Sequence, residues 1–134
     1  MLKDVYTEPL AKVVLWELLN QREPYQNISH RKMPTWEEHI AFVESKPYKA
    51  WYLIKNDEKW VGAIYLSKMN EIGIFIFKQS QSKGVGKDAV NELMKLHPSE
   101  RFLANIAPHN IKSINFFEGM GFKMIQRTYE LRND

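Results

Sequence analysis

The sequence predicts a mixed α/β (α+β) domain in which a mostly antiparallel sheet is flanked by about four helices. Three observations lead to this prediction: two N-terminal segments with helical spacing, three alternating apolar segments joined by short turns, and a C-terminal half in which helix and strand patterns alternate. The expected order is (β)ααβββαβαβ. With 134 residues, 44% of them hydrophobic, the chain suits one core, so a single domain over residues 1–134 is expected.

The two N-terminal helices are predicted from a proline, a capping box and apolar spacing. Apolar residues recur at near-helical intervals behind Pro9 and predict a helix over residues 9–20. They are Leu10, Val13, Val14 and Leu18. Thr35 and Glu38 have the spacing of a capping box, which predicts a second helix over residues 35–45.

The rest of the chain carries strand patterns and two further helices. Short turns between the central segments predict an antiparallel meander of residues 50–56, 59–67 and 71–77. The C-terminal half predicts a helix over residues 85–97, a buried strand over 101–107, a helix over 110–120 and a last strand over 122–131. The inward residues of these helices are expected to be Val85, Ala89, Leu93, Leu96, Ile111, Ile114 and Phe117. Residues 3–7 are the candidate for the short first strand.

The composition excludes several classes of function. The chain has no cysteine, which removes disulfides and thiolate chemistry, and no two histidines have metal-ligand spacing, so no metal is expected. No apolar run approaches the ~20 residues of a membrane span and no signal peptide pattern is present, so we expect a cytoplasmic protein with no membrane partner. The net charge of +3 arises in residues 78–134; it is too small to indicate nucleic acid and suits a compact polyanion.

Gly84 and Gly86 lie where a predicted strand gives way to a predicted helix. GVGKDA fits a G-x-G-x-x-A dinucleotide motif, but residues 104–109 lack the acidic partner, and a P-loop would need other residues at Gln81 and Asp88. What both motifs share remains: small residues that let backbone N–H groups converge at a helix N-terminus, which makes a cradle for pyrophosphate. A turn that only starts the helix is the alternative.

Two motifs together resemble a known family. QSKGVG at residues 81–86 fits Q/R-x-x-G-x-G/A, and NIKSINFFEGMGF at residues 110–122 resembles N-x-x-S/A-x-x-x-Y-x-x-x-G-F. In this order and at this separation they are similar to the acetyl-coenzyme A site of the GNAT N-acetyltransferase superfamily, whose element order is also the one expected above. The resemblance covers roughly residues 5–131 and implies the GNAT fold, with acetyl-coenzyme A as co-substrate.

The resemblance also implies where coenzyme A binds. Backbone amides of residues 81–87 would hold its pyrophosphate, and the strand near Ile74 and Ile76 would pair with the pantetheine amides. Asn110 and Ser113 match positions near the pantetheine arm, although Asn110 also suits a helix N-cap. The implied cofactor-binding residues are Ile74, Ile76, Gln81, Ser82, Lys83, Gly84, Val85, Gly86, Lys87, Asn110, Ser113 and Phe117.

Acetyl transfer to an amine needs a base, because an amine of pKa ~10 is protonated at neutral pH and an ammonium cannot attack a carbonyl. Glu71 is the first candidate: NEIGIFI resembles the EIG strand of a subgroup that acetylates diverse primary amines. His39, on the helix that flanks the acceptor pocket in this family, is the second. A solvated strand start and an exposed helix position are the alternatives. The family's frequent tyrosine corresponds to Phe117, which cannot donate a proton.

The resemblance therefore implies an N-acetyltransferase that passes acetyl directly to a small-molecule primary amine in a ternary complex. The aromatic residues around the expected acceptor pocket suit a sugar ring or a base, so an aminosugar nucleotide is the first candidate. They are Trp16, Tyr25, Trp36, Trp51 and Tyr65. An acetyltransferase of protein N-termini and a non-catalytic acyl-coenzyme A sensor are the alternatives. We expect a monomer or a homodimer.

Overall fold

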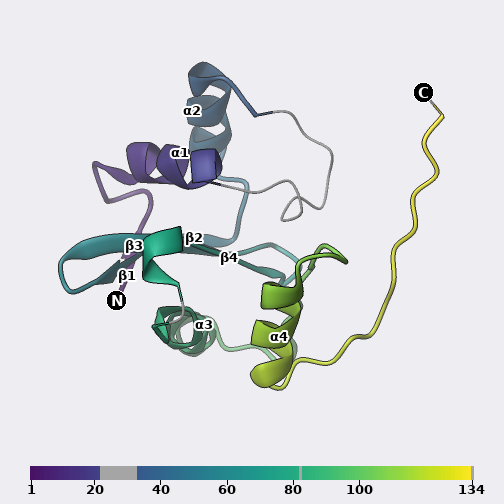
Figure 1. Ribbon diagram of the computed structural model, residues 1–134. Helices are drawn as coiled ribbons and strands as arrows, with labels where there is room; N and C mark the ends of the chain where they lie inside the picture. Colours follow the sequence, from purple (N-terminus) through teal and green to yellow (C-terminus); the bar gives the residue numbers. More distant parts are fainter. Residues whose placement is uncertain (22–32, 82, 134) are drawn as a thin grey trace.

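The computed structural model describes residues 1–21, 33–81 and 83–133 (Figure 1). Within them, four strands form one antiparallel sheet in the order β1-β2-β3-β4, accompanied by four α-helices and a short 3₁₀ turn. The elements are β1 (Leu2–Asp4), α1 (Ala11–Gln21), α2 (Trp36–Glu44), β2 (Ala50–Asn56), β3 (Lys59–Leu66), β4 (Ile72–Ile76), η2 (Lys78–Ser80), α3 (Val85–Leu96) and α4 (Ile111–Gly119). The predicted fold class is confirmed.

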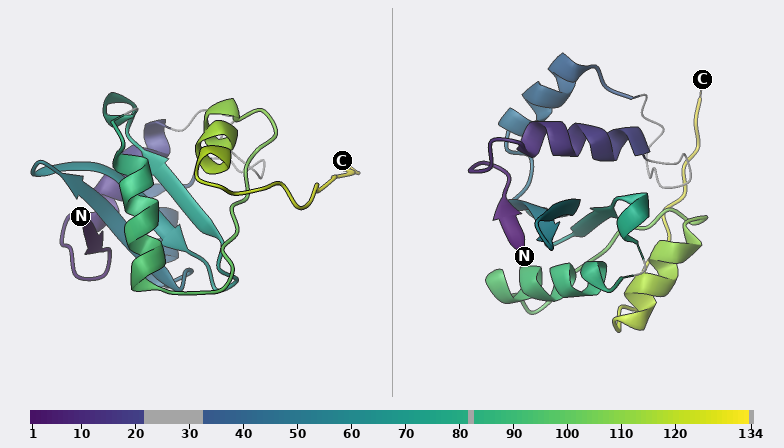
Figure 2. Two further views of the ribbon diagram at one scale, coloured as in Figure 1. Left: turned by 90° about the horizontal axis from the view of Figure 1, so that it is seen from below. Right: turned by 60° about the vertical axis from the view of Figure 1, so that its left-hand side comes forward.

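A layer of helices covers each face of the sheet. α1 and α2 lie on one face, and α3 and α4 lie on the other (Figures 1 and 2). Successive side chains of a strand point to opposite faces, so the sheet contributes to two cores. The core under α1 and α2 consists of Val5, Ala11, Val14, Leu15, Leu18, Val43, Trp51, Leu53, Ala63 and Phe77. The core under α3 and α4 consists of Ile54, Val61, Ile64, Leu66, Ile72, Val85, Ala89, Val90, Leu93 and Phe117.

Tight turns set the register of the meander. Asp57 and Glu58 connect β2 to β3 and both have left-handed backbone angles, φ 50° and 63°, which is the geometry of a two-residue hairpin whose twist matches the strands. The next hairpin pairs Tyr65 with Gly73. This pairing matters for the site, because it places an aromatic ring over the first residues of β4.

The capping box of α2 is confirmed. The Thr35 hydroxyl accepts from the backbone N–H of Glu38 at 3.1 Å, and the Glu38 carboxylate accepts from the backbone N–H of Thr35 at 2.8 Å. These bonds favour the ionised carboxylate and hold the pKa of Glu38 below its usual value.

The inner faces of the helices differ in part from the prediction. Leu10 precedes α1 and is 54% exposed, and Val13 is 46% exposed, because α1 begins at Ala11 and turns Val14, Leu15 and Leu18 toward the sheet. On the other face, Val85, Ala89 and Leu93 are buried as predicted, whereas Leu96 and Ile111 are exposed. Both exposed residues stand at helix ends, where the helix reaches past the edge of the core.

Two predicted strands are wrong in this structure. Residues 101–107 form only an isolated parallel bridge between Leu103 and Glu71. Residues 122–131 have no strand partner among the described residues; from Lys123 onward the segment is exposed and extends away from the body (Figure 1). An alternating pattern shows which residues suit a strand, but it does not supply the neighbouring edge that a strand needs. None of the described helices has the length and apolar character needed to cross a membrane.

The burial of α3 predicts a large difference between two of its leucines. Leu93 is 0% exposed, and Leu96, in the same helix, is 52% exposed. Leu93→Ala should therefore lower the free energy of unfolding by about 2–5 kcal/mol, and Leu96→Ala by less than about 1 kcal/mol. Urea unfolding of both variants measures the difference; equal losses would contradict the described packing of α3.

Candidate active site

The candidate site begins where β4 and residues 101–107 separate. The backbone N–H of Ile72 donates to the carbonyl of Leu103 at 2.7 Å, and the N–H of Leu103 donates to the carbonyl of Asn70 at 2.9 Å. Beyond this pair, no backbone hydrogen bond among the described residues joins the two segments. We call this place the branch point.

Past the branch point, one edge of β4 pairs with β3, and the other, at Ile74 and Ile76, has no backbone pairing among the described residues; we call it the open edge. The N–H of Phe77 points to β3, where it donates to Val61 at 2.9 Å, whereas the N–H of Ile72 points the other way, to Leu103. Backbone direction alternates along a strand, so the backbone groups of Ile74 and Ile76 face the open edge. These are the residues expected to pair with an extended ligand. The Gln81 side-chain amide already donates to the carbonyl of Ile76 at 3.1 Å.

The loop after β4 presents the N-terminus of α3 at the end of this open edge. Gly84 is the N-cap of α3 and has φ +78°, a left-handed conformation that glycine adopts without a steric cost. Among the described residues, no side chain caps the helix, and the first-turn N–H groups of Val85, Gly86 and Lys87 have no partner within the helix. Ser82, another predicted residue of this loop, lies outside the described residues.

Gly86 is required for a different reason. A Cβ on Gly86 would stand 3.1 Å from the ring of Phe116 and 3.8 Å from Ile74, so the missing side chain lets α3 pack closely against α4 and β4. Sequence reasoning missed Phe116, whose signal was only the doubled aromatic beside Phe117. Together these contacts hold the loop, the open edge and α4 against one another.

The predicted residues of α4 contribute mainly to its structure. Asn110 is the N-cap; its side-chain oxygen accepts from the backbone N–H of Ser113 at 3.3 Å, so the capping alternative is realised. Phe117 is buried, and its ring meets those of Phe116 and Phe122 edge-on at 5.0 and 5.1 Å. The position of the family's tyrosine is therefore part of the core here.

Glu71 lies at the branch point with both carboxylate oxygens engaged. The hydroxyl of Ser67 donates to Oε1 at 2.9 Å, and the side-chain amide of Asn105 donates to Oε2. Ser67 follows β3 and Asn105 belongs to the segment beyond the branch point, so the two donors reach the carboxylate from its two sides. Sequence reasoning named Glu71 as a candidate base and missed both donors, because nothing in the sequence pairs them with it.

Stacked aromatic rings lie over β4 at Gly73, two residues along the chain from Glu71. Tyr65 lies over Gly73, where any Cβ would overlap its ring. Tyr48 stacks on Tyr65 with 3.8 Å between centroids and 5° between planes, and Trp51 meets Tyr48 edge-on at 4.8 Å. Of the predicted acceptor aromatics, Tyr65 adjoins the branch point, Trp51 is buried in the core, and Tyr25 lies outside the described residues.

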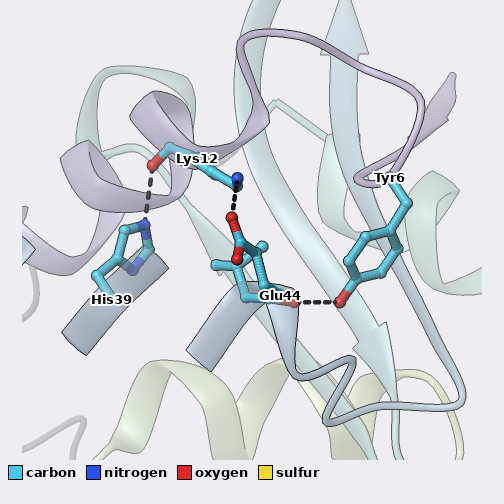
Figure 3. Close-up of polar contacts among 5 residues, drawn as sticks. Tyr6, Lys12, His39 and Glu44 are labelled. Atoms are coloured by element: carbon cyan, nitrogen blue, oxygen red, sulfur yellow. Dashed lines mark hydrogen bonds and ion pairs between the residues drawn. The ribbon is translucent and has the colours of Figure 1, made fainter. Parts of the chain in front are cut away.

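His39 lies between the two N-terminal helices. It is 3% exposed, and its Nε2 donates to the backbone carbonyl of Lys12 at 2.8 Å (Figure 3). The carbonyl is only an acceptor, so this nitrogen carries the hydrogen. The rings of Trp16 and Trp36 lie 5.4 and 5.6 Å away. These contacts tie α1 to α2, and Lys12 adds an ion pair with Glu44 at 2.7 Å.

Comparison with family models decides the family. The model described as the acetyltransferase (GNAT) family matches residues 13–122. The chain belongs to the acetyltransferase (GNAT) family. A comparison with curated proteins gives no match. The predicted resemblance is thus confirmed over most of the chain, including the loop, the branch point and α4.

Solved structures share the GNAT fold. A domain from Methanocaldococcus jannaschii DSM 2661 is 22% identical, with a TM-score of 0.81 and coverage of 97% of this chain and 92% of that one. Aminoglycoside antibiotic 6′-N-acetyltransferase AAC(6′)-IG from Acinetobacter haemolyticus is 13% identical, with a TM-score of 0.71 and coverage of 100% and 98%. AAC(6′)-Iy, in complex with the bisubstrate analogue CoA-S-monomethyl-acetylneamine, is 18% identical, with a TM-score of 0.69 and coverage of 94% and 93%. At these identities the likeness shows the fold.

The contact between Tyr65 and β4 yields a test of the aromatic wall over Gly73. Gly73→Ala puts a methyl group into the space of the Tyr65 ring, so the ring must leave its stack and the free energy of unfolding should fall by about 1–3 kcal/mol.

Gly119→Ala is the matched control, because a Cβ there meets no atom within 4 Å and Gly119 ends a helix. It should be neutral or stabilising by up to about 1 kcal/mol. Thermal and urea unfolding compare the two variants. Equal stability of Gly73→Ala and the parent protein would contradict the described position of Tyr65.

Proposed function

We propose that the protein transfers the acetyl group of acetyl-coenzyme A directly to a primary amine of a small molecule. The observation that carries the proposal is the position of the Glu71 carboxylate at the branch point, where the open edge of β4 begins. A thioester whose pantetheine arm lay along that edge would end beside a group able to accept a proton.

The cofactor part of the proposal rests on the open edge and the loop. The amides of a pantetheine arm would pair with the backbone groups of Ile74 and Ile76, although the carbonyl of Ile76 must then release or share the amide of Gln81. The pyrophosphate would lie on the N–H groups at the start of α3, where the helix dipole adds a partial positive charge. AAC(6′)-Iy, which shares this fold, was solved with a coenzyme A bisubstrate analogue.

The chemistry needs one proton acceptor and a leaving thiolate. Glu71 would take a proton from the bound ammonium, directly or through water, and the freed amine nitrogen would attack the thioester carbonyl. The C–N bond forms, the nitrogen loses its second proton to solvent as the C–S bond breaks, and the thiolate leaves. A thiol with a pKa of about 8.5 is a tolerable leaving group near neutrality, so a late proton from solvent suffices without a tyrosine at Phe117. The chain has no cysteine that could carry an acyl-enzyme thioester, which agrees with direct transfer to the amine.

We assign the base to Glu71 in preference to His39. The ring of His39 is enclosed by tryptophan rings and one nitrogen is committed to Lys12, whereas Glu71 is only partly buried.

For the acceptor we propose an amino sugar, free or linked to a nucleotide. Two proteins of this fold are aminoglycoside 6′-N-acetyltransferases by name, and the stack over Gly73 offers a flat aromatic wall.

Thiol release from acetyl-coenzyme A in the presence of amines tests the function. The panel should contain neamine, glucosamine, a nucleotide-linked amino sugar and a peptide with a free N-terminus. Turnover with an amino sugar supports the proposal. Turnover with the peptide alone would replace the acceptor class, and tight binding of acetyl-coenzyme A without turnover would indicate a sensor.

Glu71→Gln keeps the size of the side chain and removes the proton acceptor. It should lower kcat by roughly 10² or more, the usual range for a general base, while the affinity for acetyl-coenzyme A stays almost unchanged. The deficit should shrink at high pH, since free amine then comes from solvent. Steady-state kinetics between pH 6 and about 10 measure this, with exposed Glu100→Gln as the control. An unchanged kcat would remove Glu71 from the mechanism.

Gly84→Val tests the phosphate cradle. A Cβ at this position meets no atom within 4 Å, so the substitution acts through the backbone, which would leave φ +78° and turn the N–H groups away from a phosphate. The affinity for coenzyme A should fall by more than about tenfold, whereas Lys83→Ala should cost less because the contact is to the backbone. Isothermal titration with coenzyme A measures the affinity of both variants. An affinity of Gly84→Val equal to that of the parent protein would refute the cradle.

A further inference from the structure

We propose that Asn105 is a positioning residue that holds the carboxylate of Glu71 in the orientation needed for proton transfer. The inference rests on the proposed function of Glu71 and adds a residue that neither the motifs nor the family match singles out. The side-chain amide of Asn105 donates to Oε2 of Glu71, across the branch point. The bond therefore joins β4 to the segment that diverges from it.

The position of Asn105 in the chain makes this bond well placed. Leu103 is fixed to β4 by its two backbone hydrogen bonds, and Asn105 is two residues further along, after the backbone link has ended. Side chains two residues apart on an extended segment point to the same side. The backbone hydrogen bonds between the two segments end at Leu103, and the side-chain amide of Asn105 makes the next connection, to Glu71.

The chemistry of the contact fixes the orientation of the amide. An ionised carboxylate only accepts hydrogen bonds, so the amide must turn its NH₂ group toward Oε2 and its oxygen away. A hydrogen bond to an ionised group is shorter and stronger than a neutral one. Glu71 has several rotatable bonds, and a base must lie within hydrogen-bond reach of the proton that it removes. Fixing both carboxylate oxygens removes most of that freedom.

Ser67 holds the other oxygen but is committed to the turn as well. Its hydroxyl donates to Glu71 and also accepts from the backbone N–H groups of Met69 and Glu71, at 3.2 and 3.0 Å. Removing it would disturb the β3–β4 turn itself. Asn105 is exposed, and among the described residues its side chain bonds only to Glu71. It is therefore the position at which orientation can be separated from folding.

A double-mutant cycle between Asn105 and Glu71 tests the proposal. Asn105→Ala should lower kcat by about tenfold and leave the KM for acetyl-coenzyme A within about twofold, because misplacing a reacting group costs rate more than cofactor binding. In the Glu71→Gln background the same substitution should change kcat by less than about twofold, since no proton acceptor remains to be oriented. Asn91→Ala, exposed on α3, is the control.

Asn105→Asp sharpens the test, because it keeps the shape and replaces the donor by a like charge. The kcat of Asn105→Asp should fall below that of Asn105→Ala. A purely structural role of Asn105 would give the opposite order, because Asp keeps the shape of the side chain and Ala does not. Additive losses in the cycle, or a silent Asn105→Ala beside an impaired Glu71→Gln, would overturn the positioning role alone. A silent Glu71→Gln would overturn both this inference and the assignment of the base. Unfolding curves of all variants confirm that folded proteins are compared.

Discussion

The site depends on one pair of backbone hydrogen bonds, those that join Leu103 to Asn70 and Ile72. In the part of the chain that the structure describes, they are the only backbone hydrogen bonds between residues 101–107 and the beginning of β4. If the pairing continued, the backbone groups of Ile74 and Ile76 would be satisfied by protein and no ligand could add to that edge. If the pairing were absent, no backbone hydrogen bond would hold the segment that carries Asn105 next to Glu71. A single link therefore creates both the open edge and the position of the carboxylate.

Two glycines allow aromatic rings to approach β4 from opposite faces of the sheet. Gly73 makes room for Tyr65 on the face covered by α1 and α2, and Gly86 makes room for Phe116 on the face covered by α3 and α4. The first contact builds the aromatic wall over Gly73, and the second brings the start of α3 against β4. The two cores thus frame the strand, and their packing energy holds it while one of its edges stays unpaired.

Elements that depend on local sequence features were predicted more successfully than elements that depend on pairing between distant segments. The capping box of Thr35, the two-residue turn after Asn56 and the glycine at the start of α3 are local features, and each is found where the sequence places it. The strands predicted at residues 101–107 and 122–131 needed a partner that no pattern names. For the same reason, the motif named Glu71 as a candidate, whereas no pattern named Ser67 or Asn105 as its hydrogen-bond partners. His39 was predicted as the second candidate base, with an exposed helix position as the alternative; it is buried, because its ring lies against α1 and bonds to the backbone carbonyl of Lys12.

The length of the open edge limits what the site can bind. Glu71 stands at one end of β4 and the loop around Gly84 follows the other; the strand itself, Ile72–Ile76, has five residues. At about 3.3 Å per residue, a strand of this length runs for roughly 16 Å. A ligand that uses both Glu71 and the loop must be extended, anionic at one end, rich in amides along its length and reactive at the other, which is the chemistry of acetyl-coenzyme A.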